Sequence, residues 1–199
     1  MKKITLLDCT LRDGGYYNNW DFSNELVNEY LKVMSSVGIN YVELGFRSFK
    51  SRGFKGPSWY TTDSYIKSFK IPKSLKVAVM VNVSELLSHP LGPIKAIKLL
   101  FKKSKNTKIK LVRLASHYEE FNTAAEVCKV LKNMGYEVGI NLMQISEQSK
   151  EKIISISKIA HDTKPDVLYF ADSLGSMLPL GISNLISNLR NHWKGPIGI

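Results

Sequence analysis

Short apolar runs recur along the chain, and longer stretches separate them in which apolar residues repeat at helical spacing. Most runs are rich in Val, Ile and Leu and are apolar at successive positions, which is typical of strands buried on both faces of a parallel sheet. Seven strands are predicted on this basis, at residues 4–8, 40–44, 76–82, 109–115, 137–142, 167–171 and 196–199.

The stretches between these runs predict amphipathic helices. Apolar residues recur at steps of three and four over residues 121–134, and Gly135 then ends that helix. A second helix is predicted around residues 153–160, and a third is entered through Pro179. The chain therefore alternates strand and helix throughout.

Successive strands begin roughly 30 residues apart, the length of a βαβ unit. This alternation predicts an α/β fold, either a closed (β/α)₈ barrel or an open doubly wound sheet. No linker or composition shift divides the chain, so we expect one domain over residues 1–199. The first strand lacks the G-x-G-x-x-G turn of dinucleotide-binding sheets.

Polar side chains follow six strands in turn, whereas the strands themselves are apolar. The carboxyl ends of parallel strands meet at one edge of a sheet or one mouth of a barrel, where catalytic groups gather. The polar residues at these ends are Asp8, Arg12, Asp13, Glu43, Arg47, Asn82, Arg113, His117, Asn141, Gln144, Asp172 and Ser173. Asp8 by itself is best interpreted as a turn or helix cap, and His117 is open between a structural and a functional role.

Composition narrows the function classes. A chain of 199 residues with 44% hydrophobic content can bury a sizeable core. The formal charge of +11 comes mostly from dispersed lysines, which favours a solvated basic face over a phosphate-binding groove, so no nucleic-acid partner is expected. A non-catalytic basic binding domain stays as the alternative of another class.

Cellular context follows from the cysteines and from the apolar runs. Cys9 and Cys128 form no C-x-x-C pattern, which indicates reduced, structural thiols. The charges from Asp8 to Asp13 interrupt the N-terminal apolar run before it could act as a signal peptide, and no run is long enough for a membrane span. We expect a cytoplasmic protein with no membrane partner, and leave a homo-oligomer open.

Residues 8–15 contain the closest grouping of charged side chains at a strand end, because two acids flank an arginine directly after a predicted strand. An arginine can grip a carboxylate while an acid holds a metal ion or a proton. Their sequence, D-C-T-L-R-D-G-G, resembles the D-x-T-L-R-D-G signature of the pyruvate-utilising, HMG-CoA lyase-like metallolyases, and among these most closely the 4-hydroxy-2-oxovalerate aldolases. Similar segments are V-E-L-G-F at 42–46, L-V-R-L-A-S-H at 111–117, G-I-N-L-M at 139–143 and A-D-S-L-G at 171–175.

The resemblance implies a (β/α)₈ TIM barrel. Such a barrel typically has eight strands and about 250 residues. Residues 196–199 would interrupt its seventh strand, so we expect an incomplete barrel. The family's H-x-H metal pair would follow that strand.

Site residues follow from the same resemblance. Asp13 matches a metal ligand, and Arg12 a group that grips substrate and stabilises an enolate. Glu43 matches a catalytic position, with an ion pair to Arg12 as a compatible alternative. Asn141 and Ser173 are expected to bind substrate, as are Arg12 and Asp13. Tyr16 replaces the catalytic histidine of the aldolases, although a phenol with a pKa near 10 is a poor base at neutral pH.

The implied activity is cleavage of a 4-hydroxy-2-oxo acid to pyruvate and an aldehyde through a metal-stabilised enolate. The implied cofactor is Mn²⁺ or Mg²⁺, with Zn²⁺ as a further candidate, and the implied partner is a small 2-oxo acid. A Claisen-type acyl-CoA lyase or synthase is the alternative within the family. The basic, aromatic residues 46–59 are expected to form a lid that attracts an anionic substrate, with an ordinary surface loop or a contact with another subunit as the alternative. Residues 17–20 are expected to form a loop lid or to line the mouth.

Overall fold

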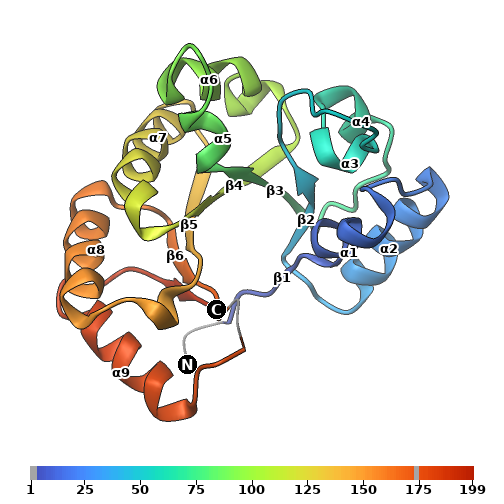
Figure 1. Ribbon diagram of the computed structural model, residues 1–199. Coiled ribbons are helices and arrows are strands. Elements are labelled where there is room, and N and C mark those ends of the chain that lie inside the picture. Colours follow the sequence, from blue (N-terminus) through green and yellow to red (C-terminus); the bar gives the residue numbers. More distant parts are fainter. Residues whose placement is uncertain (1–3, 173–174) are drawn as a thin grey trace. The chain divides into compact units, whose positions relative to one another are not determined.

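The computed structural model describes residues 4–172 and 175–199 and confirms the alternation of strands and helices (Figure 1). The strands are β1 (Leu7–Asp8), β2 (Tyr41–Phe46), β3 (Lys76–Asn82), β4 (Ile109–Ser116), β5 (Glu137–Leu142), β6 (Val167–Phe170) and β7 (Ile197–Gly198). The helices are α1 (Thr10–Asn18), α2 (Asn24–Ser36), α3 (Pro57–Tyr60), α4 (Asp63–Lys67), α5 (Val83–Leu87), α6 (Pro93–Leu100), α7 (Phe121–Asn133), α8 (Lys150–Thr163) and α9 (Pro179–Arg190). Single 3₁₀ turns are η1 (Ser104–Asn106), η2 (Tyr118–Glu120) and η3 (Ile145–Glu147).

The chain divides into two compact units. The first comprises Met1–Val81 and Leu100–Val112, and the second comprises Asn82–Leu99 and Arg113–Ile199. Strand β4 begins in the first unit and ends in the second. The hydrogen-bonded order is β1-β2-β3-β4 in the first and β4-β5-β6-β7 in the second, so the strands follow one another in chain order.

In the first unit, β1, β2 and β3 pair in parallel. Val42 is opposite Asp8 on one side and Val77 on the other, and the register shifts between Glu43 and Phe46. Gly45 lies at this irregularity with a φ of 154°, and an added Cβ would lie 1.8 Å from the Ser58 carbonyl oxygen. The residue has to be glycine because α3 packs directly against the backbone of β2.

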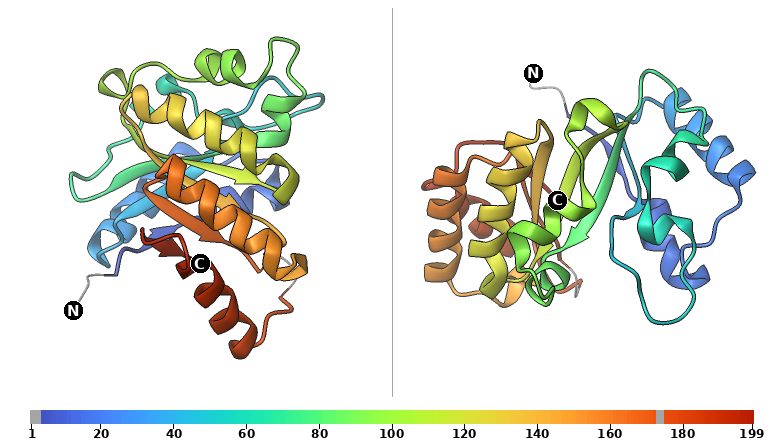
Figure 2. Two further views of the ribbon diagram at one scale, coloured as in Figure 1. Left: turned by 90° about the vertical axis from the view of Figure 1, so that its left-hand side faces the viewer. Right: turned by 90° about the horizontal axis from the view of Figure 1, so that it is seen from above.

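In the second unit, β5, β6 and β7 pair in parallel, with Tyr169 opposite Asn141 and Gly198. Helices α7, α8 and α9 lie side by side (Figure 2, left). The periodicity of residues 121–134 is confirmed, because α7 buries Phe121, Ala124, Val127, Cys128 and Leu131 and ends before Gly135.

The predicted strand over residues 4–8 is wrong at its start. Only Leu7 and Asp8 are in β1, and Ile4 and Leu6 are 79% and 48% exposed. The Asn40 side chain accepts a hydrogen bond from the Leu6 N–H (2.8 Å), where a strand partner would otherwise bind. Within the described residues β1 is the first strand of the sheet order and pairs with β2 alone, so its apolar residues are less enclosed than those of the interior strands.

Helix α2 is capped by Ser23, whose hydroxyl accepts the Leu26 N–H at 3.2 Å. Replacing Ser23 with Ala should lower the free energy of unfolding by about 1 kcal/mol, because a helix N–H loses its partner. Urea denaturation of Ser23→Ala beside Ser187→Ala, an exposed site within α9, measures this. Equal losses in the two variants would contradict the capping role.

None of the helices in the described ranges combines the length and apolar character needed to cross a bilayer.

Candidate active site

Asp8 forms the turn that leads from β1 into α1. Its Oδ1 accepts hydrogen bonds from the Thr10 N–H (3.0 Å) and the Tyr30 hydroxyl (2.6 Å). Burial raises the pKa of Tyr30, and the hydrogen bond and charge of Asp8 raise it further. The structural interpretation of Asp8 is therefore confirmed. The segment after it is a helix, α1, so Arg12, Asp13 and Tyr16 are helical residues.

Arg12 is held by a buried carboxylate. Its Nε donates to Glu43 Oε1 at 2.9 Å, and the side chains of Glu43 and Arg12 are 0% and 16% exposed. Burial alone would lower the Arg12 pKa, but the charge and hydrogen bond of Glu43, and then the charge of Asp13, raise it above its ordinary value. Arg12 therefore stays cationic, and the ion pair expected for Glu43 is present.

Asp13 is the accessible acid of this group, because its side chain is 54% exposed. Its Oδ1 accepts from Arg12 Nη1, and its Oδ2 accepts from Cys9 Sγ at 3.1 Å. Burial, and then the hydrogen bond to Asp13, raise the pKa of Cys9 to about 11. The thiol is therefore a neutral donor to Asp13 near neutral pH.

The donor chemistry of Asp13 fits a hard divalent cation, for which carboxylate oxygens are preferred ligands. Glu43 is engaged by Arg12 and is fully buried. Among residues 4–172 and 175–199, no group of three or more His, Cys, Asp or Glu side chains is close enough to hold a metal ion. Asp13 thus fits as one ligand of an ion that needs further donors.

Tyr16 lies one helical turn after Arg12 and is 66% exposed. Its ring packs edge-on against Trp20, with centroids 4.7 Å apart. Within the described residues its hydroxyl makes no hydrogen bond, so no protein group there prepares it to accept a proton. Tyr16 as a catalytic residue stays a prediction.

The expectation that Trp20 lines a mouth is wrong. Trp20 is 3% exposed, its indole N–H donates to the Arg12 carbonyl at 2.9 Å, and its ring contacts Phe46 and Trp59. The indole therefore holds the backbone of α1 at Arg12.

Two basic side chains of residues 46–59 interact with other groups of the first unit. Arg47 donates to the carbonyls of Leu100 (2.9 Å) and Thr61 (2.6 Å) and lies 3.5 Å from Asp63. Lys55 Nζ lies 4.8 Å from the Trp20 ring centroid. Arg47 has a structural role, because its guanidinium faces two backbone carbonyls and the carboxylate of Asp63. The expectation that it attracts an anionic ligand is therefore wrong.

The second unit places Asn141 beside Arg113. Arg113 Nη2 donates to Asn141 Oδ1 at 2.9 Å, and both residues are 7% exposed. The guanidinium of Arg113 lies 4.4 Å from the Tyr169 ring centroid, within cation–π range. Sequence reasoning missed Tyr169; the available signal was the pair of glycines, Gly139 and Gly198, in neighbouring strands.

Ser173 lies outside the described residues, but its neighbour Asp172 is ordered into a turn. The carboxylate of Asp172 accepts the N–H groups of Met177 (2.8 Å) and Ser176 (3.0 Å). These backbone hydrogen bonds lower the pKa of Asp172. The His117 N–H donates to Glu120 Oε2 at 3.0 Å within a capping box at η2, which agrees with the structural one of the two roles expected for His117.

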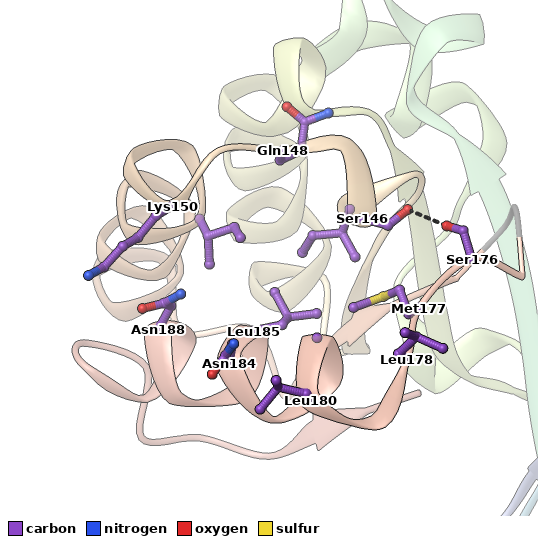
Figure 3. A pocket seen from close by; sticks show the side chains of 13 residues that line it. Ser146, Gln148, Lys150, Ser176, Met177, Leu178, Leu180, Asn184, Leu185 and Asn188 are labelled. Carbon is purple, nitrogen blue, oxygen red and sulfur yellow. Dashed lines mark hydrogen bonds between the residues drawn. The ribbon is translucent and has the colours of Figure 1, made fainter.

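A cavity of about 600 Å³ lies beyond the ends of β5 and β6, among η3, α8 and α9 (Figure 3). Apolar side chains of Ile145, Ile153 and Leu185 line it, and the hydroxyls of Ser146 and Ser176 meet at 3.3 Å at one end. Asn141 and Arg113 are not among its lining residues.

Comparisons with known proteins assign the chain to a family. The HMGL-like family matches residues 3–199. The chain belongs to the HMGL-like family. The resemblance seen in residues 8–15 is therefore confirmed at the level of the family.

Individual members and solved structures agree with this assignment. The chain is 25% identical over 198 residues to a 4-hydroxy-2-oxovalerate aldolase of Bacillus cereus, covering 99% of this chain and 56% of that protein. It superposes on the N-terminal domain of a candidate aldolase from Bacteroides vulgatus with a TM-score of 0.81 and 30% identity, over 98% of this chain and 62% of the other. For the Bacillus subtilis HMG-CoA lyase the TM-score is 0.74 at 13% identity, over 99% and 67%.

The structural likeness confirms the predicted fold class. The chain has the α/β architecture of an HMGL-like TIM barrel, and its described residues contribute seven strands in chain order. It spans about half the length of the curated relatives that it matches.

Proposed function

We propose that the full-length protein is a divalent-metal-dependent carbon–carbon lyase that cleaves a 4-hydroxy-2-oxo acid to pyruvate and an aldehyde. The observation that carries this is the placement of Arg12, fixed by fully buried Glu43, beside the accessible carboxylate of Asp13. Membership of the HMGL-like family supports it, as do curated relatives named 4-hydroxy-2-oxovalerate aldolase.

In this reaction the 4-hydroxyl loses its proton and becomes the aldehyde carbonyl. The electron pair of the C3–C4 bond moves to form the enolate of pyruvate, whose C3 then takes up a proton. Glu43 engages Arg12 Nε and Asp13 engages Nη1, so within the described residues the Nη2 donors remain for an anionic oxygen. Arg12 would donate these to the enolate oxygen as its charge develops.

The remaining roles are assigned residue by residue. Mn²⁺ or Mg²⁺, with Zn²⁺ as a further candidate, would supply Lewis-acid polarisation of the keto oxygen when bound, and Asp13 would be one of its ligands. Glu43 would keep Arg12 in position. Tyr16 would hydrogen-bond the substrate hydroxyl, and Asn141 and Ser173 would bind substrate oxygens.

The decisive test is exchange of the pyruvate methyl protons with D₂O, followed by NMR on the full-length protein with Mg²⁺ (and with Mn²⁺ in a quenched assay). Exchange is expected, because an enzyme that forms the enolate in cleavage also forms it from the product. Chelation with EDTA should abolish it, and added metal should restore it.

A parallel assay separates the alternatives. Aldehyde release from a 4-hydroxy-2-oxo acid supports the aldolase, whereas free thiol released from an acyl-CoA supports the Claisen-type chemistry instead. Absence of exchange, aldehyde and thiol with every metal tested would overturn the proposal.

A further inference from the structure

The contacts around Asn141 define which end of its amide is open to a ligand. Arginine carries only hydrogen-bond donors, so the group that faces Arg113 Nη2 at 2.9 Å must be the amide oxygen. The amide nitrogen therefore faces away from Arg113. Within the described residues Nδ2 donates no hydrogen bond, so both of its N–H groups remain for a ligand.

We propose that Arg113 is a positioning residue that locks the amide of Asn141, so that Asn141 recognises an oxygen acceptor of the anionic substrate through its Nδ2 donors. This inference rests on the proposed function, because the acceptor it names is a carboxylate or enolate oxygen of a 2-oxo acid. It also makes Asn141 a donor to substrate rather than a metal ligand, since Oδ1 faces a cation.

Tyr169 fixes Arg113 in turn. The guanidinium lies 4.4 Å from the centroid of the Tyr169 ring, and only 7% of Arg113 is exposed, so the cation has little freedom to turn away. A cation–π contact shielded from water is stronger than an exposed one. The ring thus fixes the plane from which Arg113 donates to Asn141.

Two glycines make room for the Tyr169 ring. An added Cβ at Gly139 would lie 2.8 Å from Tyr169 Cε2, and one at Gly198 would lie 2.2 Å from Cδ1. Gly198 on β7 is directly opposite Tyr169, and Gly139 on β5 is opposite Val167, two residues before Tyr169 on the same strand. The arrangement from the glycines to Tyr169, Arg113 and Asn141 is therefore built across four strands of one unit.

The substitution Asn141→Asp tests the donor assignment. Aspartate keeps an acceptor for Arg113 but has no N–H groups, so the full-length protein should keep its melting temperature while its Kd for pyruvate rises at least about tenfold, the loss expected for one hydrogen bond to a charged group. Unchanged pyruvate affinity in a folded Asn141→Asp protein would overturn the proposal.

The positioning of Asn141 is tested by substitutions of Arg113 and Tyr169. Arg113→Met and Tyr169→Leu should each raise the KM for the 2-oxo acid more than they lower kcat, and Tyr169→Phe should restore the affinity that Tyr169→Leu loses. Gly181→Ala on α9, where an added Cβ meets nothing within 4 Å, is the matched control and should leave both constants unchanged. A wild-type KM in a folded Arg113→Met protein would refute the positioning role of Arg113.

A readout without substrate separates this inference from the proposed function. In ¹⁵N NMR the Asn141 side-chain amide should show one rigid pair of N–H signals, and Arg113→Met should broaden or merge them. If the wild-type protein has no lyase activity but the signals respond in this way, the proposed function fails and the positioning role of Arg113 stands. If the signals are already mobile in the wild-type protein, the positioning role is refuted.

Discussion

Replacing Arg12 with Ala is expected to lower kcat/KM for the 2-oxo acid at least about 100-fold, the loss typical of removing one donor to a developing oxyanion. The effect should be mainly on kcat, because the enolate charge exists only after the C3–C4 bond begins to break. Steady-state kinetics on the full-length protein measure it.

Two further variants sharpen that test. Arg12→Lys keeps the charge but cannot reproduce the planar fork that engages Glu43 and Asp13 together, so it should fall between wild type and Arg12→Ala. Lys129→Ala removes an exposed cation of α7 and should have no effect on kcat. Turnover of Arg12→Ala within threefold of wild type would exclude Arg12 from enolate stabilisation.

Replacing Glu43 with Ala should lower the free energy of unfolding by about 3 kcal/mol, because the largely buried Arg12 loses its buried counter-ion. For a protein of this size that corresponds to a fall in Tm of roughly 6–12 °C. Thermal and urea unfolding, with a constant m-value, measure the change.

A double-mutant cycle identifies the cause of that loss. Removing both charges in Glu43→Ala/Arg12→Met should recover a large part of the stability that Glu43→Ala loses, since no uncompensated cation remains. A double variant that is less stable than Glu43→Ala would show that Glu43 stabilises the fold in some way other than by neutralising Arg12.

The sequence predicts the interior strands of this chain better than the edge strand. The bounds of β3 and β5 agree with the predicted runs, because strands covered on both faces have to be apolar at successive positions. The run at residues 4–8 is also mostly apolar, yet only Leu7 and Asp8 form a strand, since the composition of a run does not reveal how many neighbouring strands it has.

Helix α1 was missed because Gly14 and Gly15 argue against helix by propensity. The structure shows why a glycine is needed there: an added Cβ at Gly15 would lie 2.1 Å from the Trp20 ring. That ring packs on Phe46 and Trp59, which are distant in the chain, so no local pattern could have predicted its burial.

In the candidate site, the ion pair of Arg12 and Glu43 was an alternative that the motif allowed. The cation–π contact of Arg113 with Tyr169 joins β4 and β6, which β5 separates in the sheet, so it could not be predicted from either segment alone.

The bond from the Trp20 indole to the Arg12 carbonyl gives the chain an optical reporter of its own. Indole emission depends on the polarity and hydrogen bonding around the ring. This indole is hydrogen-bonded to the backbone carbonyl of Arg12, the candidate catalytic arginine. The Trp59 ring contacts it edge-on, with the ring centroids 4.6 Å apart, whereas Trp193 belongs to the other unit and donates its indole N–H to the Pro196 carbonyl. A ligand that displaces α1 therefore alters the intrinsic fluorescence of the protein with no dye attached.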